Sequence, residues 1–182
     1  MEKITIIAQI MGIMAMAFNI LSYQRKTRGG AIAFQLVGGL LFSVHFFLFG
    51  AFVGGVLNAV AFIRAIVFLN KEKLHADHIY WLVGFIIVYI ASYILNFTAL
   101  GKEPTMFNFV IELLPVIGMI ATTISFRYSD AKTIRRYGLI SSPSWLVYNI
   151  TTGSIGAIAC EVFSLCSIVI GIVRFDLKRK TR

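Results

Sequence analysis

Residues 145–165 read WLVYNITTGSIGAIACEVFSL, an apolar stretch that contains one acidic residue, Glu161. The short polar sequence TTGS inside it predicts a turn between two helices. Glu161 lies eight residues after Gly153 in this turn, which is about 12 Å along a helix that rises about 1.5 Å per residue. In a bilayer core about 30 Å thick this is close to the middle. An ionised carboxylate facing lipid there costs several kcal/mol, so we expect Glu161 to face the protein interior, to be paired, or to be protonated.

The composition of the whole chain is that of an integral membrane protein. Of its 182 residues, 58% are hydrophobic and only 14% are charged, and the formal net charge is +9. Soluble globular domains are less apolar and carry more charge. The basic residues lie in short clusters between apolar segments, which membrane topology explains better than nucleic-acid binding. The first apolar segment is longer than that of a signal peptide and lacks a cleavage site, so we expect it to stay in the protein.

Seven segments are apolar enough, over about 20 residues, to form membrane-spanning helices. They cover residues 3–23, 31–49, 51–70, 79–99, 105–126, 134–151 and 154–174. The connections at Gly50 and at TTGS are so short that each joins two helices in a tight hairpin. The sequence therefore predicts an all-α membrane protein with seven transmembrane helices.

The Lys and Arg residues predict the orientation, because cytoplasmic loops carry an excess of both. With the N-terminus outside, 14 of the 17 basic residues lie in cytoplasmic segments. These are Arg25, Lys26, Arg28, Lys71, Lys73, Arg127, Lys132, Arg135, Arg136, Arg174, Lys178, Arg179, Lys180 and Arg182. Lys3 and Lys102 are outside, and Arg64 is in the third span, within snorkelling reach of its cytoplasmic end. We therefore predict an outside N-terminus and a cytoplasmic C-terminus.

Sliding the chain on itself by 103 residues aligns the first three spans with the last three. The aligned pairs include Phe42 with Trp145, His45 with Tyr148, Asn58 with Glu161, and Gln9 with Glu112. This predicts two parallel three-helix repeats, residues 1–70 and 105–175, joined by a lone fourth helix within residues 71–104 and followed by a basic tail, residues 176–182. Transporters built from parallel repeats bind their substrate near the bilayer midplane, at the repeat interface.

The spacing of Trp145, Tyr148, Asn149 and Gly153, followed by Glu161, resembles the second and third helices of the SWEET, SemiSWEET and PQ-loop transporters. That resemblance implies a substrate pocket lined by an aromatic side chain on one helix and an amide on the next. A closer resemblance, over essentially the whole chain, is to the YgjV-type bacterial inner membrane proteins. It is carried by VHFF (44–47), IELLPVIG (111–118), GSIG (153–156) and IVRF (172–175). It implies a multi-pass protein of the bacterial inner membrane.

One feature of the PQ-loop transporters is absent from this chain. Their Pro-Gln pair ends the first helix, whereas this chain has Tyr23-Gln24 there and Phe126-Arg127 at the equivalent place in the second half. A proline hinge is therefore not expected at either position.

Nine residues expected near the repeat interface form the candidate substrate pocket. They are Gln9, Phe42, His45, Asn58, Glu112, Trp145, Tyr148, Asn149 and Glu161. Two carboxylates against one histidine favour a cationic or zwitterionic solute, while Asn, Trp and Tyr also suit a neutral sugar or nucleoside. Burial favours the protonated form of a carboxylic acid, so Glu161 and Glu112 are candidate proton-coupling residues.

Each candidate also has a structural interpretation. Glu161 could pair with His45 or Arg64, and Glu112 with Gln9 or Tyr148, in bonds that only fix helix packing. Phe42, His45 and Trp145 could equally be core residues. Cys160 and Cys166 are six residues apart on one predicted helix, so they favour neither a disulfide nor a metal site.

We expect a small-molecule carrier that works by alternating access, with a proton as a candidate coupling ion and the lipid bilayer as its environment. The alternative is a membrane-embedded binding or assembly subunit whose basic cytoplasmic face docks anionic lipid or a partner. A homo-oligomer is left open. An enzyme is not expected, because no nucleophile with an adjacent base and no His-Glu-x-x-His motif occurs. His75 and His78 lack a second ligand cluster, so we expect neither a metal nor a cofactor.

Overall fold

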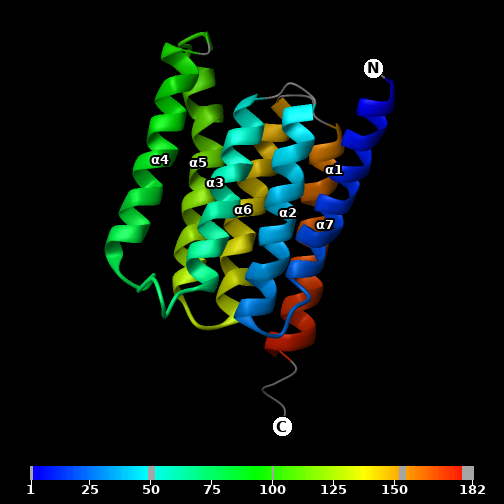
Figure 1. Cartoon of the computed structure of the whole chain (residues 1–182), viewed down its shortest axis with the longest axis vertical. Coiled ribbons are helices and arrows are strands. Elements are labelled where there is room, and N and C mark those ends of the chain that lie inside the picture. The colour runs from blue at the N-terminus through cyan, green and yellow to red at the C-terminus, as the bar shows by residue number, and fades with distance from the viewer. Residues whose placement is uncertain (1, 49–51, 100, 152–154, 178–182) are drawn as a thin grey trace.

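The computed structural model describes residues 2–48, 52–99, 101–151 and 155–177, and all regular secondary structure in these ranges is helical (Figure 1). The helices are α1 (Glu2–Ser22), α2 (Arg28–Leu48), α3 (Phe52–Leu69), α4 (Ile79–Thr98), α5 (Met106–Arg127), α6 (Ala131–Thr151) and α7 (Ile155–Gly171). A π-helical segment, Ile172–Leu177, continues α7. The predicted all-α class and the seven helices are confirmed. The turns predicted at Gly50 and Gly153 lie outside the described residues.

Capping side chains fix where two of the helices begin. The Thr105 side chain accepts a hydrogen bond from the backbone nitrogen of Asn108 at 3.2 Å, at the start of α5. Asp130 accepts one from the backbone nitrogen of Thr133 at 2.7 Å, at the start of α6. Such caps satisfy backbone donors that have no partner within the helix, and each contributes about 1 kcal/mol.

Five helical segments in the described residues are long and apolar enough to cross a membrane. They are Ile4–Ser22, Arg28–Leu48, Ile79–Thr98, Met106–Arg127 and Gly156–Leu177. The described apolar part of α3 is shorter, Gly55–Leu69, and α6 carries several serines and basic residues. Both helices run alongside apolar neighbours (Figure 1). Large apolar side chains such as Ile87 and Phe107 are 60% and 63% exposed, as expected for helices that face lipid.

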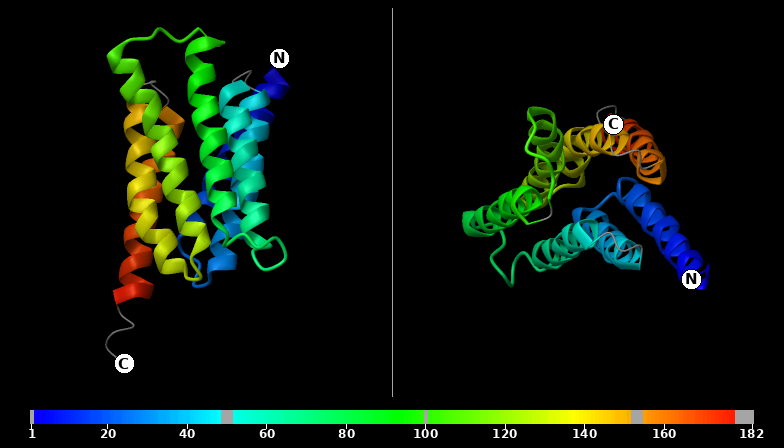
Figure 2. Two further views of the ribbon diagram at one scale, coloured as in Figure 1. Left: turned by 90° about the vertical axis from the view of Figure 1, so that its left-hand side faces the viewer. Right: turned by 90° about the horizontal axis from the view of Figure 1, so that it is seen from above.

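The helices form two groups that face each other (Figure 2). In the first bundle α1, α2 and α3 pack in succession, and in the second bundle α5, α6 and α7 do the same, while α4 packs on α5. Contacts between the bundles join α1 to α7, α2 to α6, and α3 to α5. α6 begins and ends 103 residues after α2, and α7 begins 103 residues after α3. Two bundles related by a two-fold axis would make this pattern of contacts. The duplication and the orientation in the membrane stay predictions.

Most of the largest buried side chains gather at one end of the molecule. This basic end is formed by the last turns of α1, α3, α5 and α7 and the first turns of α2, α4 and α6 (Figure 1). The buried side chains there include Phe68, Phe126, Ile32, Ile134 and Ile168. The N-terminus of the chain lies at the opposite end (Figure 1). The apolar core therefore fills the space between the bundles on the basic side of the middle.

Candidate functional site

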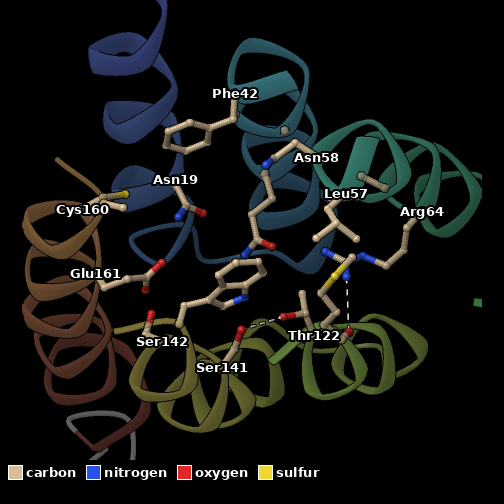
Figure 3. A pocket seen from close by; sticks show the side chains of 18 of the residues that line it. Asn19, Phe42, Leu57, Asn58, Arg64, Thr122, Ser141, Ser142, Cys160 and Glu161 are labelled. Atoms are coloured by element: carbon tan, nitrogen blue, oxygen red, sulfur yellow. Dashed lines mark hydrogen bonds between the residues drawn. The ribbon is translucent and has the colours of Figure 1, made fainter. Parts of the chain in front are cut away.

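A cavity of about 180 Å³ lies between the two bundles (Figure 3). All six helices of the bundles contribute to its lining among the described residues, and α4 contributes none. One water molecule needs about 10–15 Å³ of such space, so the cavity can hold several waters or a small solute. Polar side chains, including Asn19, Gln35 and Asn58, are interspersed with aromatic ones.

Sixteen residues of this lining form eight pairs that are 103 positions apart. The pairs are Asn19 and Thr122, Tyr23 and Phe126, Gly38 and Ser141, Gly39 and Ser142, Phe42 and Trp145, Phe46 and Asn149, Leu57 and Cys160, and Asn58 and Glu161. Equivalent positions reach one common cavity when a two-fold axis passes through it. The cavity therefore lies where the sequence comparison expects the repeat interface.

Five of the nine predicted pocket residues line this cavity, namely Phe42, Asn58, Trp145, Asn149 and Glu161. Phe42 lies across the cavity from α6, which carries Trp145 (Figure 3). Asn149 is 7% exposed. The other four residues, Gln9, His45, Tyr148 and Glu112, are not among its lining.

Three of these four residues lie in helix contacts or on the surface. Gln9 is exposed on α1. The Nδ1 atom of His45 lies 2.8 Å from the carbonyl oxygen of Ala8, and its ring packs against Gly12, so His45 joins α2 to α1. The ring of Tyr148 packs edge-on against that of Trp145, with centroids 6.0 Å apart. Tyr148 therefore touches a pocket residue from outside the pocket.

Glu112 is buried, with 6% of its side chain exposed, and is paired away from the cavity. Its Oε1 lies 2.8 Å from Nζ of Lys102, and its Oε2 accepts a hydrogen bond from Nδ2 of Asn96 at 3.2 Å. These partners belong to α4 and the connection after it, not to the expected Gln9 or Tyr148. The ion pair neutralises the charge of Glu112 and ties α5 to the end of α4.

Glu161 points into the cavity from α7 (Figure 3). Its carboxylate lies beside the hydroxyl of Ser142, a side chain that is 3% exposed. The described residues form two ion pairs, Lys102 with Glu112 and Arg135 with Asp176, and Glu161 is in neither. Its charge is therefore not balanced by a basic side chain.

Arg64 also lines the cavity, which its sequence position did not suggest. It is 6% exposed and turns inward instead of reaching the surface at the basic end. Its Nη1 donates a hydrogen bond to the Tyr89 hydroxyl at 3.2 Å, and its Cζ lies 5.1 Å from the ring centroid of Phe126. Its buried Nε has no hydrogen-bond partner among the described residues. Leu57, Ala61 and Arg64 follow each other at helical spacing on one face of α3, which is the sequence signal for this position.

Among the described residues, the cavity lining thus contains one carboxylate, that of Glu161, and one guanidinium, that of Arg64. A negative pocket was expected from two carboxylates. The charges are instead balanced, because Glu112 is paired elsewhere and Arg64 faces inward.

Hydrogen bonds between the bundles close the basic end of this cavity. Nη2 of Arg28 on α2 donates to the carbonyl oxygen of Phe126 on α5 at 2.6 Å, and to that of Phe68 at 2.7 Å. Nε2 of Gln24 donates to Oγ of Ser167 on α7 at 2.9 Å. Lys71 donates to the carbonyl oxygen of Arg127. These bonds end on backbone or hydroxyl oxygens, which water can replace as partners when the bundles separate.

The fold and the cavity define a multi-pass α-helical membrane protein with a polar pocket between two helix bundles. The family model Imp-YgjV, described as a bacterial inner membrane protein, matches residues 6–179, and the chain belongs to this family. The chain is 27% identical over 169 residues to the inner membrane protein YgjV of Escherichia coli (strain K12), covering 93% of this chain and 84% of that protein. No solved structure matches the chain. The predicted YgjV-type family and the multi-pass inner membrane location are therefore confirmed, whereas the relationship to the SWEET and PQ-loop transporters stays a prediction.

Proposed function

We propose that this protein carries a small polar solute across the inner membrane by alternating access. The observation that supports the proposal is the cavity lined by eight pairs of equivalent positions from the two bundles. Parallel-repeat transporters place their substrate site at such an interface, near the middle of the membrane. A cavity of this kind is accessible to both sides in turn when one bundle rocks against the other.

In this proposal the bonds at the basic end hold the cavity closed toward the cytoplasm. Arg28 and Gln24 of the first bundle bond to Phe126 and Ser167 of the second. Breaking them exposes donors and acceptors that water can satisfy, so each net loss is about 1 to 3 kcal/mol. A conformational change with such a cost is within the range that substrate binding can shift. Glu161 is the proposed proton-coupling residue, since the charge of Glu112 is already balanced by Lys102.

A second candidate function is a binding or assembly subunit that transports nothing. The contacts of Glu112 and His45 favour it, because both polar residues serve helix packing outside the cavity. The two candidates differ in one measurable property. A carrier exposes its central cavity to water from both membrane faces in turn, whereas a packing core does not.

Cysteine labelling in oriented vesicles tests this difference. The chain has two cysteines, so C160S and C166S give a cysteine-free background. A61C then places one thiol in the cavity, where Ala61 is a lining residue on α3. The matched control is A91C, because Ala91 is an exposed residue on the lipid-facing helix α4.

A membrane-impermeant thiol reagent is added to right-side-out and to inside-out vesicles. We expect A61C to react from both sides and A91C to react from neither. An A61C thiol that reacts from only one side, or not at all, would contradict alternating access and favour the assembly subunit.

A further inference from the structure

Arg64 and Glu161 bring opposite charges into one cavity without pairing with each other or with another charged side chain. The ion pairs of the described residues include neither of them. Arg64 is 6% exposed, and its Nε lacks a hydrogen-bond partner. Figure 3 shows the two side chains reaching into the cavity from opposite sides, from α3 and α7. A buried charge without a counter-charge is costly. The cavity therefore favours an occupant that carries one positive and one negative group.

Four hydroxyl side chains lie near the two charges. They are Ser142 and Ser141 on α6 and Thr122 and Thr123 on α5. Ser142 lies beside Glu161 (Figure 3), and Oγ1 of Thr123 lies 3.4 Å from Nη1 of Arg64. Between these two places, Oγ1 of Thr122 donates to Oγ of Ser141 at 3.1 Å. Both charges therefore have a hydroxyl group as a neighbour.

The size of the cavity limits the ligand. Glu161 and Arg64 reach into the cavity from opposite sides, so a ligand that contacts both must lie across it (Figure 3). The cavity volume of about 180 Å³ is enough for several water molecules, so the ligand must be small. A small amino acid, which carries one ammonium and one carboxylate group, meets both conditions.

The two charges occur where the two halves of the cavity differ. The position equivalent to Glu161 is Asn58, and the position equivalent to Arg64 is Ser167. Most of the other lining residues come from equivalent positions of the two bundles and are uncharged, so the two charges make the cavity electrically asymmetric. A dipolar ligand has one preferred orientation in such a cavity, whereas an uncharged ligand gains nothing from the difference.

We infer that the ligand of this cavity is a compact zwitterion, with its amine on Glu161 and its carboxylate on Arg64. This inference rests on the proposed carrier function and narrows its substrate class. The carboxylate of Glu161 can hold either the ammonium group or a proton. The ligand and a proton therefore compete for this side chain.

The inference is tested by thermal stabilisation of the detergent-purified full chain, because a ligand that binds the folded state raises its Tm. The probes are the common α-amino acids, each with its amide, which lacks the carboxylate, and its N-acetyl form, which lacks the amine. β-Alanine, γ-aminobutyrate and 6-aminohexanoate vary the charge spacing. We expect at least one unmodified short zwitterion to raise Tm, and blocking either end to weaken it about tenfold or more.

Variants of Glu161 and Arg64 test which side chain binds the amine of the ligand and which binds its carboxylate. E161Q should bind the N-acetyl form as well as the parent amino acid, because no carboxylate is left to hold the amine. R64Q should bind the amide as well as the parent amino acid, whereas R64K, which keeps a cation, should retain the preference for a carboxylate; a preference that R64Q also retains would overturn the role of Arg64. The matched control is E112Q, which removes a buried glutamate of the same bundle outside the cavity. It should leave the order of the probes unchanged.

The outcomes separate this inference from the proposed function. An amide or an uncharged solute that binds as well as the zwitterion would overturn the inference, and so would a ligand preference that E161Q does not alter. The absence of a rise in Tm with any of these probes would also overturn it. In each of these cases A61C labelling from both sides would still support a carrier, whereas an unreactive A61C would remove the carrier as well.

Discussion

Arg135 on α6 and Asp176 in the π-helical segment after α7 form a buried ion pair with two hydrogen bonds. Nη2 of Arg135 donates to Oδ1 of Asp176, and Nε donates to Oδ2 at 3.0 Å. Their side chains are 3% and 6% exposed. Nη1 also donates to the carbonyl oxygen of Arg25 at 3.0 Å, so the pair joins the second bundle to the chain after α1. Arg135, one of the basic residues that predict the orientation in the membrane, therefore also holds two parts of the fold together.

Removing one partner of this pair should be costly. In D176L the guanidinium of Arg135 stays buried without a counter-charge, so we expect a loss of about 3–5 kcal/mol in the free energy of unfolding. Replacing both partners, as in R135M/D176L, should restore most of the loss, because no unpaired charge remains. Denaturant unfolding in detergent measures both variants. Equal losses in the single and double variants would contradict this explanation.

Ligand binding should depend on pH through Glu161. As the pH falls, a proton competes with the ammonium group for this carboxylate, so the affinity for a zwitterion decreases. E161Q should bind weakly at mildly acidic and at neutral pH alike, with no pH dependence between them. E112Q serves as the control and should keep the dependence of the wild type, since Glu112 lies outside the cavity. Titration calorimetry at the two pH values gives the comparison. A wild-type dependence that persists in E161Q would assign it to another group.

Gly12 should not tolerate a larger side chain while His45 is present. A Cβ atom at Gly12 would lie 2.8 Å from Nδ1 and 2.9 Å from Cε1 of the His45 ring. Because this ring is held by the carbonyl of Ala8, we expect G12A to lower stability by about 1–3 kcal/mol. In an H45A background the same substitution should cost less than about 0.5 kcal/mol. The double-mutant cycle is read from Tm and denaturant midpoints. Purely additive losses would exclude the steric contact as the cause.

Arg28 should control opening of the basic end. R28A removes the donor that joins the carbonyl oxygens of Phe68 and Phe126, and charged hydrogen bonds contribute about 1.5–3 kcal/mol. We therefore expect A61C to react about tenfold faster from the cytoplasmic side in R28A. K26A is the matched control, because Lys26 is an exposed basic residue two positions away. If R28A and K26A label at the same rate, the Arg28 bonds do not hold the cavity closed.

The helices could be predicted from the sequence because their signals are local. Apolar length gave seven segments, and α2 and α6 begin three residues before their predicted spans, at Arg28 and Ala131. The polar first turns of these helices lack the hydropathy of a span but still form helix, since hydrogen bonding within the helix does not require an apolar side chain. The depth of Glu161 in the membrane stays a prediction from its spacing on the chain.

The direction in which a side chain points could be predicted only in part. Asn58 and Glu161 were expected in the pocket from their depth and line it. Glu112 was expected there for similar reasons, but Asn96 and Lys102 bind it from α4 and the connection after it. Those partners depend on which face of α5 the fourth helix covers, and no local pattern encodes that choice.

Arg64 was missed for a related reason. Arg64 is close enough to the end of its span for the side chain to reach the membrane surface. Because a charged group costs less free energy there than in the interior, the guanidinium was expected at the surface. In the fold, Tyr89 and Phe126 surround the guanidinium from α4 and α5. These two residues come from helices that follow later in the chain, and their contacts offset part of the cost of burial.

The paired lining of the cavity has a consequence for how such a protein can be built. A homodimer of one three-helix half would present every charge twice, with two guanidiniums or two carboxylates facing each other across the axis. Joining both halves in one polypeptide lets position 58 remain an asparagine while position 161 is a glutamate, and position 64 an arginine while position 167 is a serine. Covalent fusion thereby allows the two halves to diverge, and only a diverged pair can distinguish one end of its ligand from the other.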